Sequence, residues 1–163
     1  MSRRLVVAPA AAALVLGAAL PAATAQGPPR TVTFREVAKS TTFTYVDNPP
    51  RGKSPQRPRF SAGDAFVLNV PLINDAGARR GSLRATCTVI ARPKDPNRAP
   101  ALCTGVVTLK EGQIVIVVSS TNLEAKVTTG SVVGGTRAYA GARGTFSSVT
   151  SKAGTRDTVT LLD

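Results

Sequence analysis

The sequence predicts an all-β protein, either a small antiparallel barrel or a sandwich. Short segments rich in β-branched and aromatic residues recur along the chain, and Gly, Pro, Asn and Asp separate them. After the N-terminal leader, no segment shows the apolar repeat of an amphipathic helix. The length of 163 residues suits one domain. We therefore expect seven or eight short strands around a single core.

The leader, residues 1–25, has the pattern of a secretory signal peptide. Arg3 and Arg4 are basic, an apolar stretch runs from Leu5 to Leu20, and Ala23-Thr24-Ala25 is a small-residue cleavage site. The apolar stretch is shorter than the roughly 18 to 20 residues of a spanning helix. We expect an exported protein, secreted or in the cell envelope, whose folded domain is residues 26–163. The paired arginines leave the general and the twin-arginine export routes both open.

The first strand region covers 31–37 and 41–47, where β-branched and aromatic residues gather. Residues 48–59 follow, and they contain four prolines among basic side chains. Proline cannot donate to a sheet ladder, so this segment is predicted to be a loop.

A second strand is expected over 65–73, followed by a turn at 74–77. The Asx residues and Gly77 of that turn supply a local hydrogen bond and a positive φ. Pro71 would cost a central strand one hydrogen bond, so we expect it at a bulge or near the strand end.

Segments 83–91 and 101–109 are predicted to form a hairpin in which Cys87 faces Cys103. The same register places Val89 opposite Ala101, Ala85 opposite Gly105, and Leu83 opposite Val107. In an exported protein an even pair of cysteines indicates one disulfide, whereas in the cytosol the two would be free thiols or a redox pair.

The next strand, 113–119, follows a predicted turn at Glu111-Gly112. This turn pairs Ile114 with Leu109, Ile116 with Val107, and Val118 with Gly105. Residues 114–118 are apolar on both faces. We expect one face in the barrel interior and the other in a contact between subunits.

The last strands are expected over 123–129, 144–151 and 155–162, with Ala153-Gly154 as the final turn. The segment 134–144 is too rich in glycine for a stable helix and is predicted to be a connection with one helical turn.

Charge and composition exclude several kinds of site. The chain has 21 Lys and Arg against nine Asp and Glu, a formal charge of +12, and no His. A Ser-His-Asp triad is therefore impossible, and a structural zinc site is not expected from two Cys alone. Nucleic-acid binding is not expected either, because the basic loop lacks the interleaved aromatic residues that stack on bases. The charge does predict an unspecific, salt-sensitive attraction to an anionic envelope.

Several acidic side chains and two phenols could take part in proton transfer. The acids are Asp47, Asp64, Asp75, Glu111, Glu124 and Asp157, and the phenols are Tyr45 and Tyr139. Asp64, Asp75 and Glu111 lie in turn contexts that explain them structurally. Asp47 follows Phe43 and Tyr45 at a period of two, so it lies at the rim of the barrel if the two rings face the interior, and is a solvated loop carboxylate otherwise. A carboxyl group beside an apolar cavity would have a raised pKa.

The chain resembles the bacterial allene oxide cyclase barrel-like proteins, which share their barrel with plant dirigent proteins. The resemblance rests on Tyr45-Val-Asp-Asn-Pro-Pro-Arg-Gly52, on Ser61-Ala-Gly-Asp-Ala-Phe-Val67, on Cys87 and Cys103, and on Gly134-Gly-Thr-Arg-Ala-Tyr-Ala-Gly-Ala-Arg-Gly144. It implies an eight-stranded antiparallel β-barrel of calycin type with an apolar cavity, a trimer, and no metal or organic cofactor. Arg137 stands where the family block usually has Gly, and the basic insertion after Gly52 is longer than in the family.

These observations predict an exported barrel that holds a hydrophobic small molecule in its lumen. The residues expected at the ligand are Phe43, Tyr45, Ile116 and Arg143, with Arg143 taken from the shared Ala-Arg-Gly motif. If the barrel is an enzyme, the resemblance implies a cofactor-independent cyclase or isomerase, or a dirigent-like guide of a coupling, with Asp47 or Tyr45 as proton donor. The alternative is a non-catalytic basic protein of the cell envelope.

Overall fold

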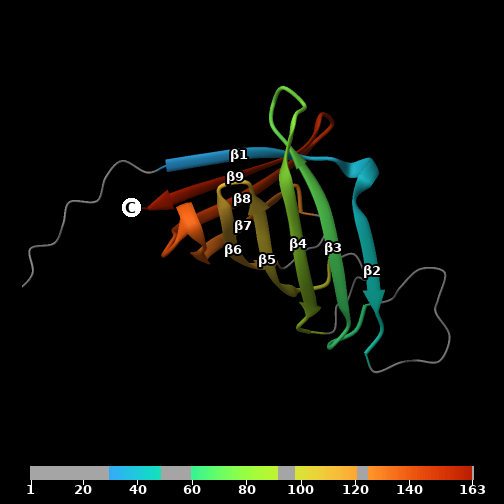
Figure 1. Cartoon of the computed structure of the whole chain (residues 1–163). Helices are drawn as coiled ribbons and strands as arrows, with labels where there is room; N and C mark the ends of the chain where they lie inside the picture. Colours follow the sequence, from blue (N-terminus) through green and yellow to red (C-terminus); the bar gives the residue numbers. More distant parts are fainter. Residues whose placement is uncertain (1–29, 49–59, 92–97, 121–124, 163) are drawn as a thin grey trace, which may run out of the picture.

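The computed structural model describes residues 30–48, 60–91, 98–120 and 125–162 (Figure 1). The predicted signal peptide, most of the proline-rich loop and Glu124 lie outside these residues.

The described residues form one antiparallel sheet of nine strands that closes on itself. In chain order the strands are β1 (Arg30–Glu36), β2 (Thr42–Val46), β3 (Ala65–Ile73), β4 (Arg79–Val89), β5 (Ala101–Leu109), β6 (Gly112–Ser120), β7 (Val127–Gly135), β8 (Arg143–Ser151) and β9 (Gly154–Leu162). β1 pairs with β9 on one side and with β3 on the other, which closes the barrel. β1 and β2 pair with successive parts of β3, so together they fill one position of an eight-stranded barrel (Figure 1). The predicted fold class is confirmed.

The interruption between β1 and β2 explains Pro71. The short 3-10 helix η1 (Ala38–Ser40) separates the two strands, and the N–H of Val37 donates to the carbonyl of Pro71. In an antiparallel sheet the N–H and C=O of one residue point to the same neighbouring strand. The N–H that Pro71 lacks would therefore point to the break between β1 and β2, where no strand residue needs it. A register shift between Leu72 and Ile73 lies next to it, as the sequence predicted.

The hairpin of β4 and β5 has the predicted register. Cys87 lies opposite Cys103 and forms a disulfide with it, and the three predicted neighbouring pairs are also present. The turn after β3 is confirmed too, because Asn74 Oδ1 accepts the N–H of Ala78 and Gly77 has a φ of 81°.

The register predicted for β5 and β6 was wrong by two residues. Ile114 lies opposite Val107, Ile116 opposite Gly105, and Val118 opposite Cys103. The turn is Lys110–Glu111, two exposed polar residues, while Gly112 already belongs to β6. A side chain at Gly112 would collide with the carbonyl of Thr136, so glycine is needed in the strand rather than in the turn. A shift of two keeps each side chain on its face, so the interior was predicted correctly.

The end of the chain differs in its boundaries. β7 extends through Gly134 and Gly135, which were predicted to belong to the connection, and the last turn is Lys152–Ala153 instead of Ala153-Gly154. The predicted helical turn is present as the 3-10 helix η3 (Arg137–Tyr139). Gly135 allows η3 to pack against the sheet, because a side chain there would collide with the backbone of Tyr139 and Gln113.

The core fills one end of the barrel. It is formed mainly by Phe34, Val70, Leu72, Leu83, Val107, Leu109, Ile114, Ile116, Val132, Tyr139, Phe146, Val159 and Leu161. Tyr139 on η3 closes this end from outside the sheet. No helix among the described residues is long and apolar enough to cross a membrane.

Candidate functional site

Beyond this core the barrel interior contains a smaller apolar cluster of Phe66, Cys87 and Ala101, and a cavity. The cavity has a volume of about 140 Å³. Its lining consists of Glu36, Leu68, Leu83, Ala85, Cys87, Cys103, Gly105, Ile116, Val118, Thr128, Phe146 and Ser148. Most of these groups are apolar, and Glu36 is the one residue with an ionisable side chain in this described part of the lining.

Small residues create the space. Ala85 lies opposite Gly105, and Thr128 enters from β7, where a longer apolar side chain would fill the lumen. A methyl group at Gly105 would lie 3.0 Å from Ile116 and 3.1 Å from Leu83. The chain therefore packs Gly105 tightly between larger neighbours while leaving room beside Ala85.

Two acidic side chains meet at the wall of this cavity, and both are placed by strand alternation. On β1, Phe34 and Glu36 face inward at a period of two, and on β9 Asp157 does so in phase with Val159. Asp157 lies opposite Phe34 on β1 and opposite Ser148 on β8. The closure of the barrel thus brings Glu36 beside Asp157.

Asp157 is fully buried, and neither oxygen of its carboxyl group has a well-aligned hydrogen-bond donor in the described structure. Burial raises the pKa of Asp157 to about 6, although the neighbouring Ser148 and Glu36 act in the opposite direction. Burial, together with the charge of Asp157 and hydrogen bonding to it, raises the pKa of Glu36 to about 7. Two carboxyl groups in contact in an apolar surrounding share a proton near neutral pH.

Tyr45 and Asp47, which the sequence singled out as catalytic, belong to a different cluster. The Tyr45 hydroxyl donates to Asp64 at 2.7 Å and lies 3.5 Å from Asp47. Asp64 is fully buried, and the backbone N–H groups of Asn48 and Ser61 also donate to it. These groups lie where β2 ends and β3 begins, and none of them lines the cavity described above.

The four predicted ligand residues lie in different places. Ile116 lines the cavity. Phe43 is 53% exposed and stacks on Phe66, with ring centroids 5.4 Å apart. Tyr45 packs edge-on against Phe60 in the same aromatic group. Arg143 is exposed at the start of β8. The disulfide of Cys87 and Cys103 contributes to the cavity wall.

Glu36 was missing from the predicted acid-base residues. The signal was available, because Val32, Phe34 and Glu36 alternate on one face of β1. An acid in phase with buried apolar residues is predicted to face inward, and the same pattern holds for Asp157. Within the described ranges, no group of three or more His, Cys, Asp or Glu side chains could hold a metal ion.

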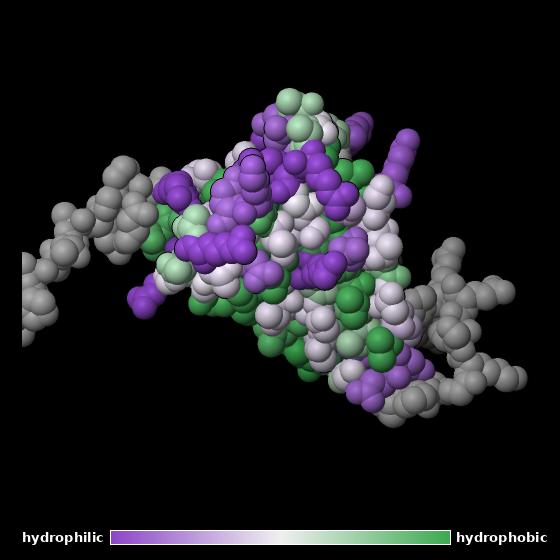
Figure 2. All heavy atoms as spheres, viewed as in Figure 1, coloured by the Kyte–Doolittle hydropathy of each residue, from purple (hydrophilic) through white to green (hydrophobic). Residues whose placement is uncertain are grey.

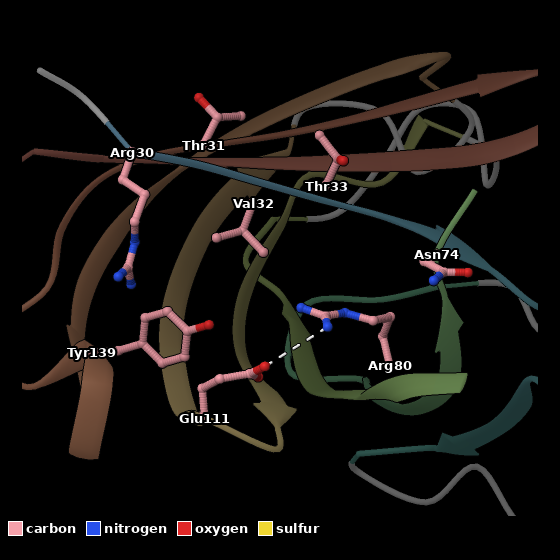
Figure 3. A pocket seen from close by; sticks show the side chains of 8 residues that line it. All are labelled: Arg30, Thr31, Val32, Thr33, Asn74, Arg80, Glu111 and Tyr139. Carbon is pink, nitrogen blue, oxygen red and sulfur yellow. Dashed lines mark ion pairs between the residues drawn. The ribbon is translucent and has the colours of Figure 1, made fainter. Parts of the chain in front are cut away.

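A second hollow, of about 390 Å³, opens at the end of the barrel that Tyr139 closes (Figure 3). The guanidinium of Arg30 lies over the ring of Tyr139, 5.0 Å from its centroid. Across the hollow, Arg80 forms an ion pair with Glu111 at 3.7 Å. Figure 2 shows hydrophilic side chains gathered around this end of the molecule.

Comparisons with known proteins support the fold. No protein-family profile and no curated protein sequence matches the chain. Among solved structures, a pyocyanin demethylase matches with a TM-score of 0.63 and 21% identity, over 81% of this chain and 99% of that one. The pterocarpan synthase dirigent protein GePTS1 matches with a TM-score of 0.61 and 14% identity, over 83% and 84%. The Diels-Alderase AbmU from Streptomyces koyangensis matches with a TM-score of 0.59 and 15% identity, over 82% and 63%.

At these identities the likeness concerns the fold. The chain has an eight-stranded antiparallel β-barrel with the fold of the dirigent protein, the pyocyanin demethylase and the Diels-Alderase.

Proposed function

We propose that this protein binds a small, largely apolar molecule in its lumen and that Glu36 and Asp157 serve a proton transfer to or from that molecule. The observation that carries the proposal is the fully buried carboxyl group of Asp157 behind the cavity wall, which contacts the acidic Glu36 and has no well-aligned hydrogen-bond donor among the described residues. Burying two carboxyl groups together without a counter-charge costs stability, so their place beside a cavity favours a role in the site over a structural one.

Glu36 is the group that reaches the ligand. It lines the cavity, whereas Asp157 lies behind it, and burial together with Asp157 raises the pKa of Glu36 to about 7. A carboxyl group with a pKa near 7 can both give and accept a proton at physiological pH. The cavity supplies the second requirement, because it confines a flexible molecule to few conformers. This chemistry suits a cyclisation or isomerisation without a cofactor, as the dirigent protein and the Diels-Alderase of the same fold suggest by their names.

In this proposal Glu36 and Asp157 take the acid-base role that the sequence suggested for Asp47 and Tyr45. The hydrogen bond from Tyr45 to Asp64 supports a structural role for that cluster. Ile116 remains a ligand-contacting residue, and Phe43 is proposed to contact molecules that enter past β2.

Binding in the lumen can be tested with toluene, because a cavity of this volume holds a benzene-sized ring. We expect toluene to shift the methyl NMR signals of Ile116 and Val118, which face the cavity. Ala85→Leu should abolish the shifts by filling the space. Thr86→Leu is the matched control, because Thr86 is the next residue of β4 and is exposed. Unchanged methyl signals in the folded wild type would refute lumen binding.

Proton transfer is tested on any substrate that the protein converts. Glu36→Gln keeps the shape of the side chain and removes its proton exchange. We expect kcat to fall by about 10²- to 10⁴-fold with little change in KM. A variant with full kcat would limit the role of the pair to binding.

A second candidate is a non-catalytic protein that adheres to an anionic envelope. Arg30 supports it, because within the described residues its guanidinium contacts the Tyr139 ring and no carboxylate. Arg30→Gln with Arg80→Gln should then weaken binding to phosphatidylglycerol vesicles, and 0.5 M salt should have a similar effect. Vesicle binding that is unchanged by the two substitutions and by 0.5 M salt would contradict this candidate.

A further inference from the structure

The charge of the cavity is opposite to that of the protein. The whole chain carries a formal charge of +12, yet among the described residues that line the lumen Glu36 is the only one with an ionisable side chain, and Asp157 lies directly behind it. Ser148 and Thr128 add hydroxyl groups, and no Lys or Arg belongs to this described part of the lining.

The basic side chains next to the acidic pair are directed elsewhere. Arg35 and Arg156 lie opposite each other on β1 and β9, each beside one of the acids in sequence. Strand alternation turns both away from the lumen. Arg35 donates to the carbonyl of Ala153, and Arg156 pairs with Asp75 on the β3–β4 turn. Neither guanidinium neutralises the pair from inside the barrel.

We propose that the lumen selects ligands that carry a cationic group, such as a protonated amine beside an aromatic or aliphatic ring, and rejects carboxylates. The inference rests on the proposed function, since it names the ligand class of the same cavity. A cation placed against Glu36 supplies the positive charge that the described surroundings of Glu36 and Asp157 lack, where charge interactions are weakly screened. An anion would meet like charge, and only the hydroxyl groups of Ser148 and Thr128 in the described lining could donate to it.

The test uses three ring compounds of equal size at pH 8: benzylamine as a cation, benzyl alcohol as a neutral molecule and benzoate as an anion. Binding is followed by the methyl NMR signals of Ile116 and Val118. We expect benzylamine to bind about tenfold more tightly than benzyl alcohol, and benzoate to bind at least about tenfold more weakly than benzyl alcohol. Glu36→Gln should bring the affinities for benzylamine and benzyl alcohol together. Glu111→Gln, which changes an exposed carboxylate outside the cavity, should preserve the preference.

A measurement on the unmodified protein does not depend on how the variants fold. The preference for benzylamine should fade as the pH falls from 8 to 5, because Glu36 becomes protonated around its pKa of about 7. Among the described residues, the neighbours of the acidic pair are Ser148 from β8 and the apolar Leu72 from β3, so in this part of the chain only Glu36 and Asp157 titrate there.

The outcomes separate the two proposals. Equal binding of the three compounds, or tighter binding of benzoate, would overturn the cation selectivity and leave lumen binding intact. A preference that persists in folded Glu36→Gln would also overturn it. Unchanged methyl signals with all three compounds and with toluene would refute the proposed function itself, and the selectivity with it.

Discussion

The hydroxyl of Tyr45 donates a 2.7 Å hydrogen bond to Oδ2 of Asp64. The carboxylate also accepts the backbone N–H groups of Asn48 at 3.0 Å and Ser61 at 2.6 Å, so it joins the chain before and after residues 49–59. Burial would raise the pKa of Asp64, but these donors outweigh it and lower the pKa to about 2. The cluster therefore stabilises the end of the barrel where β2 and β3 meet.

Asp64→Asn is expected to lower the free energy of unfolding by about 2 to 4 kcal/mol, because it weakens three hydrogen bonds to a buried charge. The depressed pKa means that this stabilisation is present above about pH 4 and is lost as the pH falls towards 2. Urea unfolding at pH 7 measures the loss. Asp75→Asn is the control, since it breaks an exposed ion pair with Arg156 worth about 1 kcal/mol or less. Equal effects of the two substitutions would contradict the role of Asp64.

Glu36 and Asp157 should give the opposite pH dependence. Their pKa values are raised in the folded protein to about 7 and about 6, so the folded state binds more protons than the unfolded chain between about pH 4 and 7. Stability from this pair is complete below about pH 4 and is lost as the pH rises through 7. We expect Asp157→Asn to raise the free energy of unfolding at pH 8 by on the order of 1 to 3 kcal/mol, because it removes one of two like charges that are buried together. Stability that increases from pH 5 to 8 in the wild type, with no gain in the variant, would contradict this assignment.

The contrast between these two clusters shows what the sequence could predict about the site. Asp64 was assigned to a turn from its neighbours at 61–63, and local chemistry was sufficient for that. Glu36 and Asp157 are far apart in the sequence, near the start and the end of the predicted domain, and they meet because β1 pairs with β9. Alternation predicts the face of each residue, but no local pattern states which two strands close a barrel. The contact between Glu36 and Asp157 can therefore be recognised only once the pairing of β1 with β9 is known.

The register of a hairpin could be predicted where two cysteines face each other, as in β4 and β5. The register of β5 and β6 was predicted from the assumption that Gly112 belongs to the turn, whereas it belongs to β6. That glycine is required by the carbonyl of Thr136 on a distant connection, and a sequence pattern alone assigns it to the turn.

Removal of the disulfide should lower the stability of the barrel while the chain still folds. The bridge joins residues 16 apart, and replacing Cys87 and Cys103 by Ala is expected to lower the free energy of unfolding by about 3 kcal/mol, mainly through the unfolded chain. Because both residues line the cavity, the smaller alanines should also enlarge the lumen. Reduction of the wild type without mutation checks the first effect separately. Unfolding curves that coincide for the oxidised and reduced protein would show that the bridge contributes no stability.

The outer face of β6 gives the last prediction, a contact between copies of the chain. Ile114, Ile116 and Val118 are buried in the interior, while Val115 and Val117 point outward and are half-buried in a single chain. We expect this outer face to meet another subunit, because five successive apolar residues leave no side of the strand suited to water.

Replacing Val115 and Val117 by Lys should then dissociate an oligomer while the barrel stays folded. Ile116→Lys is the contrasting variant, since an unpaired charge inside the core should unfold the chain. Light scattering reports the mass and circular dichroism the fold. A wild type that scatters as a monomer, or a double variant that keeps an oligomeric mass, would place the contact elsewhere or remove it.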